Sequence, residues 1–399
     1  MSWDRVVNDV LTRGFWVMRR LDPLFRPLID HLVRPPLQAL VQWLVRRRLP
    51  DRGLGLAEES PLEGEAASTA RIVHAMTSFL EEHYPPPAHA ERAGNTKTYG
   101  LVRGELTVRS DVPEELRHGL FARAASYPAW VRFAGPGPLA PPDLHDNAVM
   151  SIGVKVMGVP GPKLLEDERA TQDFTGISAP TFTTPDVVQN AILQEELGNG
   201  TPLFYFIRPG HTHLADLVMQ GLYAKTAASP LQETYWSCVP YLLGEGRAMQ
   251  YRFVPRPFPR LRVPWRPGPD YLRAAMVRTL AEHEVVLDLL VQLQTDPRLM
   301  PVEHAGVMWS ERHSPPRPVA SLRLPVQSFD TDAQRAFADR LSFNPWHAMP
   351  EHRPLGNQNR ARRVIYTRLA AARQQMNHVT HVEPTGEEDL SDDSSQRPG

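Results

Sequence analysis

The stretch that decides the fold lies near the C-terminus and reads Pro354-Leu355-Gly356-Asn357-Gln358-Asn359-Arg360-Ala361-Arg362-Arg363-Val364-Ile365-Tyr366. A helix is predicted over residues 358–375. Arg362 and Tyr366 are four residues apart, so they share one face of that helix. A phenol is a poor metal ligand until it ionises, and a neighbouring guanidinium stabilises the phenolate. The pair therefore fits an axial ligand of haem iron, and the alternative is an arginine-rich surface helix with a tyrosine packed inward.

Three short segments precede this stretch and favour the iron-ligand interpretation over the surface helix. They are Trp130-Val131-Arg132-Phe133-Ala134, Asp146 with Gly153-Val154-Lys155-Val156, and Asp173-Phe174-Thr175-Gly176 through Pro180-Thr181-Phe182. In this order they resemble the Val-Arg-Phe-Ser, Arg-Asp … Ala-Val-Lys-Phe and Asp-Leu-Val-Gly-Asn-Asn-x-Pro-x-Phe segments of the catalase family. Arg362-x-x-x-Tyr366 resembles the proximal motif of the same family. The resemblance covers about residues 85–375.

A divergent bacterial branch of catalase-like proteins is the closer match. Its Phe-Asn-Pro-Trp and Pro-Leu-Gly-x-x-Asn-Arg-x-Arg motifs resemble residues 343–346 and 354–362. The resemblance implies a catalase-like antiparallel β-barrel of about eight strands surrounded by helices. It also implies a haem, of the b type, with Tyr366 as the axial ligand of the iron and Arg362 beside it. Arg132 would then bind a haem propionate, with Ile177, Ala134 and Phe182 on the distal side.

The pattern of strands and helices agrees with an α+β fold. Runs that mix β-branched and aromatic residues with alternating polar ones predict strands over residues 99–108, 129–134, 148–157, 235–241, 248–254, 285–293 and 320–326. Helices are expected near 68–83, 113–124, 185–197, 212–224, 270–282, 331–340 and 358–375. Because strands and helices do not alternate one to one, an antiparallel sheet or barrel is favoured over a parallel sheet.

Two alignments with the family are possible at the position of the distal catalytic base. In the family a histidine stands in Arg-x-x-His-x-Lys-x-x-Gly and moves the peroxide proton. His74 follows Arg71 at the right spacing, but its surroundings predict a helix. The alternative frame, Arg92 through Gly100, keeps the arginine, lysine and glycine and leads into a strand. In that preferred frame the histidine is replaced by Asn95, which can hydrogen-bond but cannot act as a base near neutral pH.

Two further departures accompany Asn95. The family's distal asparagine aligns with Ile177, and the serine that orients the histidine aligns with Ala134. Rapid disproportionation of hydrogen peroxide is therefore not expected. The first hypothesis is a haem oxidoreductase that acts as a slow peroxidase or processes organic or lipid hydroperoxides, with a role in oxidative stress. The second is a retired haem- or lipid-binding protein on the same scaffold, and the third is an interaction module without haem.

Composition sets the remaining expectations. The formal net charge of -1 gives no reason to expect nucleic-acid binding. The single cysteine, Cys238, excludes an internal disulfide framework and fits a reducing cytoplasm. Neither a membrane span nor a signal peptide is predicted.

Three regions are expected along the chain. Residues 1–55 form a basic amphipathic arm, in which ten arginines against five aspartates give a charge of +5. Four prolines should break it into short pieces. The arm could lie peripherally on the inner membrane face or pack on its own domain or on a second subunit of a homo-oligomer. Residues 56–382 form the catalase-like domain, and the acidic tail from 383 to 399 is expected to be disordered.

Overall fold

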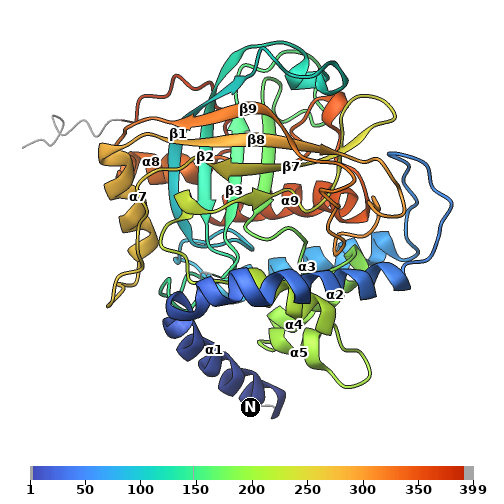
Figure 1. The fold of residues 1–399 in the computed structure, drawn as a ribbon. Helices are drawn as coiled ribbons and strands as arrows, with labels where there is room; N and C mark the ends of the chain where they lie inside the picture. Colours follow the sequence, from blue (N-terminus) through green and yellow to red (C-terminus); the bar gives the residue numbers. More distant parts are fainter. Residues whose placement is uncertain (1–2, 147, 391–399) are drawn as a thin grey trace, which may run out of the picture.

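Eight antiparallel strands close into a barrel at the centre of the molecule (Figure 1). The structure is a computed structural model that describes residues 3–146 and 148–390. The strand order is β5-β4-β3-β2-β1-β9-β8-β7, and a pairing between β5 and β7 closes the ring. The strands are β1 (Thr98–Val108), β2 (Ser126–Ala134), β3 (Ser151–Val156), β4 (Gln172–Ile177), β5 (Tyr235–Trp236), β7 (Ala248–Pro255), β8 (Val285–Leu293) and β9 (Arg317–Leu324), with a short β6 (Tyr241–Leu242) beside β7.

The interior of the barrel is filled by apolar side chains. Strand β8 shows why, since buried and partly exposed residues alternate along it, as expected for a strand with one face inward. Its buried residues join those of β1, β2, β3, β4, β7 and β9 in one continuous core. Eight-stranded barrels of this size are packed rather than open. A site of useful size must therefore lie outside the barrel wall.

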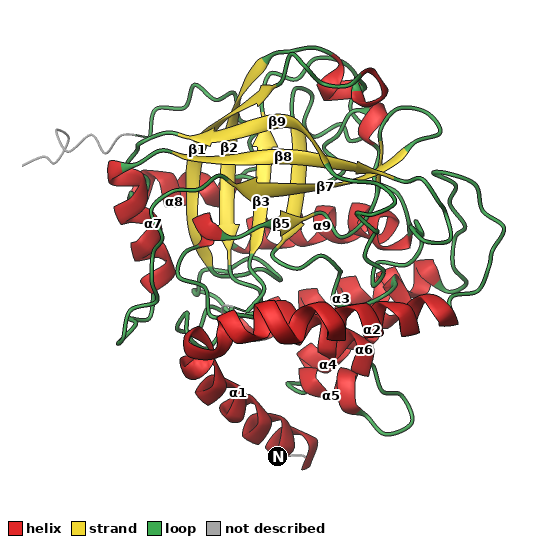
Figure 2. Ribbon diagram, viewed as in Figure 1, coloured by secondary structure: helices red, strands yellow, loops and turns green. Residues whose placement is uncertain are grey.

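Helices gather mainly on one side of this barrel (Figure 2). There α3 (Glu65–His83), α4 (Val187–Gly198) and α9 (Asn357–Met376) share an apolar cluster built from Ile72, Leu80, Val187, Ala191, Ala361, Ile365 and Leu369. Two short helices, α5 (Pro202–Ile207) and α6 (Leu214–Tyr223), follow α4. Elsewhere on the barrel lie α7 (Tyr271–Glu282) and α8 (Asp332–Arg340), both in contact with β1. None of the described helices is long and apolar enough to cross a membrane.

The sequence analysis identified most of these elements and was wrong on a few. Strand β4 was not predicted, and the strand expected over residues 235–241 is two short strands, β5 and β6, because Pro240 and the positive φ of Cys238 interrupt it. The helix expected over residues 113–124 is two 3₁₀ turns, Glu114–Leu116 and Gly119–Ala122. The short helix α5 was also missed.

The N-terminal arm, residues 3–48, is more continuous than its prolines suggested. It consists of α1 (Trp3–Leu28), a π-helical turn (Ile29–Val33) and α2 (Arg34–Arg48), and α1 runs through Pro23. Pro23 has no N–H to donate to the carbonyl of Arg19. The hydroxyl of Thr226 donates to that carbonyl at 2.7 Å instead, which supplies the missing hydrogen bond.

Part of the acidic tail is also ordered, contrary to expectation. Glu383 accepts hydrogen bonds from the backbone amides of Arg169 and Ala170 at 2.7 and 2.6 Å. The carboxylate of Glu388 accepts one from the indole nitrogen of Trp130 at 3.0 Å. These contacts hold residues 383–390 against the barrel, and the remainder of the predicted tail lies outside the described residues.

Candidate functional site

Helix α9 is fixed at its first turn by three consecutive side chains. Asn357 donates to the backbone oxygen of Glu303 at 2.9 Å, Gln358 donates to Thr184 Oγ1 at 2.9 Å, and Asn359 donates to the carbonyl of Pro240 at 2.9 Å. Gly356 precedes them with φ of +84°, and a Cβ there would lie 2.4 Å from the carbonyl of Val302. The turn therefore requires glycine. The Gly-Asn-Gln-Asn sequence thus sets where α9 begins and how it is rotated.

Arg362 connects α9 to the barrel wall. Its Nη2 donates to the phenol oxygen of Tyr366 at 2.9 Å and to Thr175 Oγ1 on β4 at 2.7 Å. Its Nη1 donates to Asn359 Oδ1 at 3.0 Å. Burial alone would lower the pKa of Arg362, but the oxygens of Tyr366 and Tyr241 outweigh burial and raise it. A permanent positive charge is thereby held against the phenol oxygen of Tyr366.

Tyr366 faces a cavity of about 580 Å³ between the barrel wall and helices α3, α4 and α9. This volume is typical of small-molecule and cofactor sites. Apolar side chains of α3, α4 and α5 form one side of it, among them Ile72, Met76, Phe79, Leu193 and Phe206. The barrel contributes its β3 and β4 residues, including Ser151, Gly153, Thr175 and Ile177. The hydroxyl of Ser342, which also lines the cavity, is buried without a hydrogen-bond partner.

Three arginines line the same cavity: Arg132 and Arg373, which are buried, and Arg92, which is partly buried. Burial, and then the charge of Arg373, lower the pKa of Arg132 to about 10. Burial and repulsion from the other two guanidiniums likewise hold the pKa of Arg92 well below its usual value. Within the described residues neither Arg92 nor Arg132 forms an ion pair, and the carboxylate of Asp339 is 3.8 Å from Arg373. Buried like charges of this kind call for an anionic ligand.

Arg132 is aimed by the loop that carries Asn95. Its guanidinium donates to the carbonyl of Asn95 at 2.7 Å and to Thr98 Oγ1 at 2.9 Å. Its Nη1 has no hydrogen-bond partner among the described residues and remains available. Asn95 itself has φ of +46°, and it lines the cavity.

Of the other candidate residues, some line the cavity and others do not. Ile177 and Phe182 line the cavity with Asn95. Ala134 is buried on β2 behind that lining, paired with Ser151 of β3. His74 is exposed on α3 and does not line the cavity.

Three other arginines of α9, Arg360, Arg363 and Arg368, do not line the cavity. Arg360 forms ion pairs with Glu59, Glu65 and Glu303 at 2.6 to 2.9 Å. Arg363 covers the ring of Trp346, and Arg368 is exposed. Arg373 was the arginine that sequence reasoning missed. It follows Tyr366 by seven residues, which is two helical turns, so the same spacing rule could have found it.

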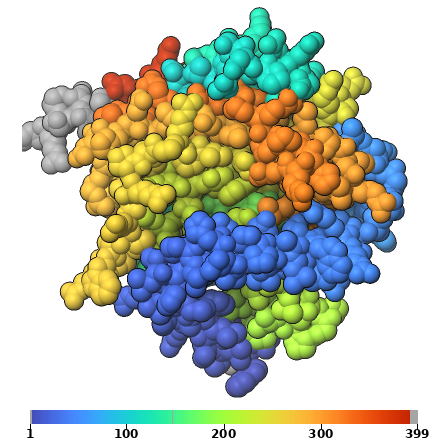
Figure 3. All heavy atoms as spheres, viewed as in Figure 1, coloured from blue at the N-terminus to red at the C-terminus, as the bar shows by residue number. Residues whose placement is uncertain are grey.

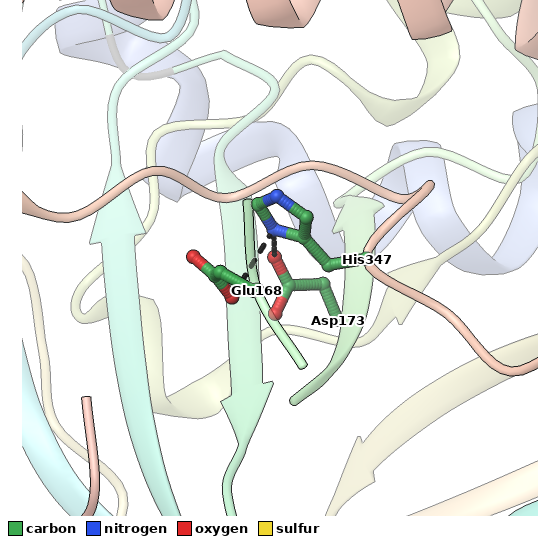
Figure 4. Close-up of side chains that lie close together, drawn as sticks. All are labelled: Glu168, Asp173 and His347. Atoms are coloured by element: carbon green, nitrogen blue, oxygen red, sulfur yellow. Dashed lines mark hydrogen bonds and ion pairs between the residues drawn. The ribbon is translucent and has the colours of Figure 1, made fainter. Parts of the chain in front are cut away.

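A second buried cluster lies beside the segment that leads into α9, and its side chains are drawn in Figure 4. Glu168, Asp173 and His347 point toward one another at distances that would suit a metal ion. The ammonium of Lys155 occupies their centre, however, since it pairs with Glu168 and donates to Asp173 at 2.8 Å. Burial alone would lower the pKa of Lys155, but the charges of Asp173 and Glu168 outweigh it and raise that pKa. Burial would likewise raise the pKa of Glu168, but Lys155, His381 and His347 outweigh it and lower that pKa. The cluster is thus an ion-pair network with a lysine where a metal would bind.

This network positions the segment that leads into α9. Asp173 accepts a hydrogen bond from the backbone amide of Asn344 at 2.8 Å. Two residues later, the indole nitrogen of Trp346 donates to the carbonyl of Asn359 at 2.7 Å. The Phe-Asn-Pro-Trp segment therefore links the buried ion pairs on β3 and β4 to the turn that carries Arg362.

No family model matches this sequence, and no curated protein matches it. Solved structures do. A fungal catalase superposes with a TM-score of 0.55 at 16% identity, covering 80% of this chain and 71% of that protein. A bacterial catalase gives 0.52 at 14% identity, with 76% and 62% covered, and catalase A from Saccharomyces cerevisiae gives 0.52 at 13%, with 79% and 69% covered. The chain has the catalase fold.

Within the catalase fold, the cavity of this chain lies between a packed barrel and the C-terminal helix. Its Arg362–Tyr366 pair comes from α9, and its positive charge comes from β2, from α9 and from the loop before β1. The barrel wall contributes isoleucine and glycine together with the hydroxyls of Ser151 and Thr175, and the helices contribute the larger apolar side chains. The cavity can therefore hold a group that is anionic at one end and flat or apolar elsewhere.

Proposed function

We propose that this protein binds haem in the cavity and processes apolar hydroperoxides, with little ordinary catalase activity. The observation that carries the proposal is the Arg362–Tyr366 hydrogen bond of 2.9 Å at a cavity that is also lined by Arg92, Arg132 and Arg373. The Tyr366 oxygen offers a ligand for iron, and the three arginines offer partners for carboxylates.

The residues present fit a haem. The phenol oxygen of Tyr366 is a hard oxygen ligand of the kind that ferric haem accepts. Arg92, Arg132 and Arg373 would bind the two propionates, whose charge would relieve the repulsion among the guanidiniums. Thr175 and Ile177 are two residues apart on one face of β4, a separation of roughly 7 Å. A flat ring that lies between these two side chains, in van der Waals contact with both, needs about that spacing.

Bound haem would supply the iron centre at which a peroxide oxygen–oxygen bond is cleaved. The chain's own residues determine what reaches that centre. Arg362 holds the Tyr366 oxygen in place through the 2.9 Å hydrogen bond and keeps a positive charge beside it. On the other side, Ile177 and Phe182 present hydrocarbon, and Asn95 offers an amide that donates and accepts hydrogen bonds but takes up no proton. Such a wall favours an alkyl peroxide over a small hydrated one.

The first experiment is an absorption spectrum of the haem-supplemented protein. The expected result is a Soret band of the ferric phenolate type that is lost in Tyr366→Phe. The matched control is Tyr127→Phe, which changes a tyrosine on β2 outside the cavity and should leave the band intact. A chain that shows no Soret band after haem supplementation would instead be an interaction module without haem.

Turnover then separates an enzyme from a retired scaffold. The expected result is peroxidase activity with an alkyl or fatty-acid hydroperoxide that exceeds the rate with hydrogen peroxide and disappears in Tyr366→Phe. The alternative function, a haem- or lipid-binding protein without catalysis, is motivated by the missing distal base. It would be supported by a normal Soret band with no turnover of any hydroperoxide.

A further inference from the structure

The arm, residues 3–48, turns its polar side toward the body of the protein. Arg26 donates to the carbonyls of Leu222 and Ala224 at 3.1 and 2.6 Å. Asp22 accepts a hydrogen bond from the amide of Thr226 at 2.7 Å. These partners are backbone groups of α6 and of the loop after it, so directional hydrogen bonds hold α1 at this point.

Helix α2 is held in the same way. The side chain of Gln42 donates to the carbonyl of Gly306 at 3.0 Å and accepts from the amide of Met308 at 2.8 Å. Arg46 donates to the carbonyl of Met308 at 2.6 Å. Such contacts fix the rotation of both helices and therefore which side faces outward.

The outward side of the arm is apolar. Sixteen of the 22 large apolar side chains that are exposed among the described residues belong to it. Leu24, Phe25, Leu28 and Leu32 are each more than half exposed, and Trp43 is 51% exposed. In the space-filling view the arm is the blue band across the lower part of the molecule (Figure 3). Surface helices of globular proteins normally show the opposite arrangement, and a continuous apolar surface marks an interaction site.

Positive charge borders this apolar surface. Arg13, Arg20, Arg47 and Arg48 are exposed and form no ion pair with any other described residue. The guanidinium of Arg47 covers the ring of Trp43 at 5.1 Å, and tryptophan is enriched where apolar and aqueous phases meet. An apolar stripe flanked by arginines matches the interface of a bilayer that contains anionic lipid.

We propose that the arm docks this protein on an anionic membrane surface, with α1 and α2 lying in the plane of the interface. A second copy of the chain fits the surface less well. A symmetric dimer through this face would bring two segments of charge +5 together, and like charges oppose association. This inference is independent of haem binding.

Docking would also bring the cavity close to the bilayer. Trp16 of α1 stacks on His145, with ring centroids 4.2 Å apart and an interplanar angle of 12°. His145 belongs to the loop between β2 and β3, and Pro136, Pro138 and Val149 of the same loop line the cavity. The arm therefore contacts a loop that contributes to the cavity wall.

The test is cosedimentation of the full-length protein with vesicles of phosphatidylcholine, alone or mixed with phosphatidylglycerol. Binding is expected only to the mixed vesicles and should weaken at high salt. The variant Leu24→Gln/Phe25→Gln/Leu28→Gln should lower the partition coefficient at least ~100-fold. Arg13→Gln/Arg20→Gln should lower it about 25-fold. Both variants keep every inward hydrogen bond, so both should fold.

A matched control uses exposed apolar residues outside the arm. Leu214→Gln/Trp265→Gln/Val326→Gln removes side chains that are 54%, 89% and 55% exposed, and it should bind vesicles as the wild type does. The proposal is overturned if the wild type does not bind the mixed vesicles. It is also overturned if the protein forms a dimer that Leu24→Gln/Phe25→Gln/Leu28→Gln dissociates, because the face would then belong to a second copy.

Discussion

Replacing Lys155 by methionine removes the ammonium at the centre of the buried network. Lys155, Glu168 and Asp173 are each at most 1% exposed, so the two carboxylates would lose the ammonium without gaining water and would have to share His347 as their buried cation. Breaking a buried ion pair from one side costs about 3–5 kcal/mol. Lys155→Met should therefore lower the free energy of unfolding by about that amount, measured by urea denaturation near neutral pH.

The loss should also depend on pH. In Lys155→Met the carboxylate of Glu168 loses the attraction that lowers its pKa in the wild type, so its protonation at low pH costs the folded variant less than it costs the folded wild type. The difference from wild type should then be largest near pH 8 and shrink toward pH 5. Arg109→Met, which breaks the exposed 2.7 Å pair with Asp111, should cost less than about 1 kcal/mol. A loss below about 1 kcal/mol for Lys155→Met, or one that does not change with pH, would refute the reasoning.

Three further predictions concern His347, Asn95 and Arg132. Burial lowers the pKa of His347, but hydrogen bonds with Asp167 and Asp173 outweigh it and raise the pKa to about 9. About 3 kcal/mol of stability should thus be present below pH 6.5 and be lost as the pH rises through 9. In His347→Gln the free energy of unfolding should change less with pH over this range. Asn95→His places a base at a backbone conformation that histidine tolerates. Oxygen evolution from hydrogen peroxide by the haem-loaded protein should then rise at least ~100-fold. An unchanged rate with an intact Soret band would contradict the distal position of residue 95. Arg132→Met should weaken haem binding about tenfold or more in a spectral titration, whereas Arg363→Met, which changes an exposed arginine outside the cavity, should not.

Local spacing explains what could be predicted from the sequence. Arg362 and Tyr366 meet because residues four apart share a helix face, and α9 begins within one residue of its expected start. Strand β8 was predicted with its observed bounds because its alternation is visible in the sequence. In each case the partners lie within one element, so no knowledge of the rest of the chain was needed.

What could not be predicted depends on residues far apart in sequence. Strand β4 contains Asp173 and Gly176, which disfavour a strand, and the Lys155 ammonium that makes Asp173 acceptable lies on another strand. The continuity of α1 depends on a hydroxyl at Thr226, more than two hundred residues away. The outward direction of the arm's apolar side likewise follows from backbone groups in two distant loops.

The position of the arm along the chain has a consequence for synthesis. Between Arg48 and Met308 the ribosome adds 260 residues, which takes roughly 13–52 s at the usual rate of translation. One backbone carbonyl that holds the arm, at Leu222, is made part-way through that interval, and another, at Met308, at its end. Until then the arm has no scaffold to fix its rotation. Its apolar stripe is thus exposed to chaperones or a membrane well before the barrel closes behind it.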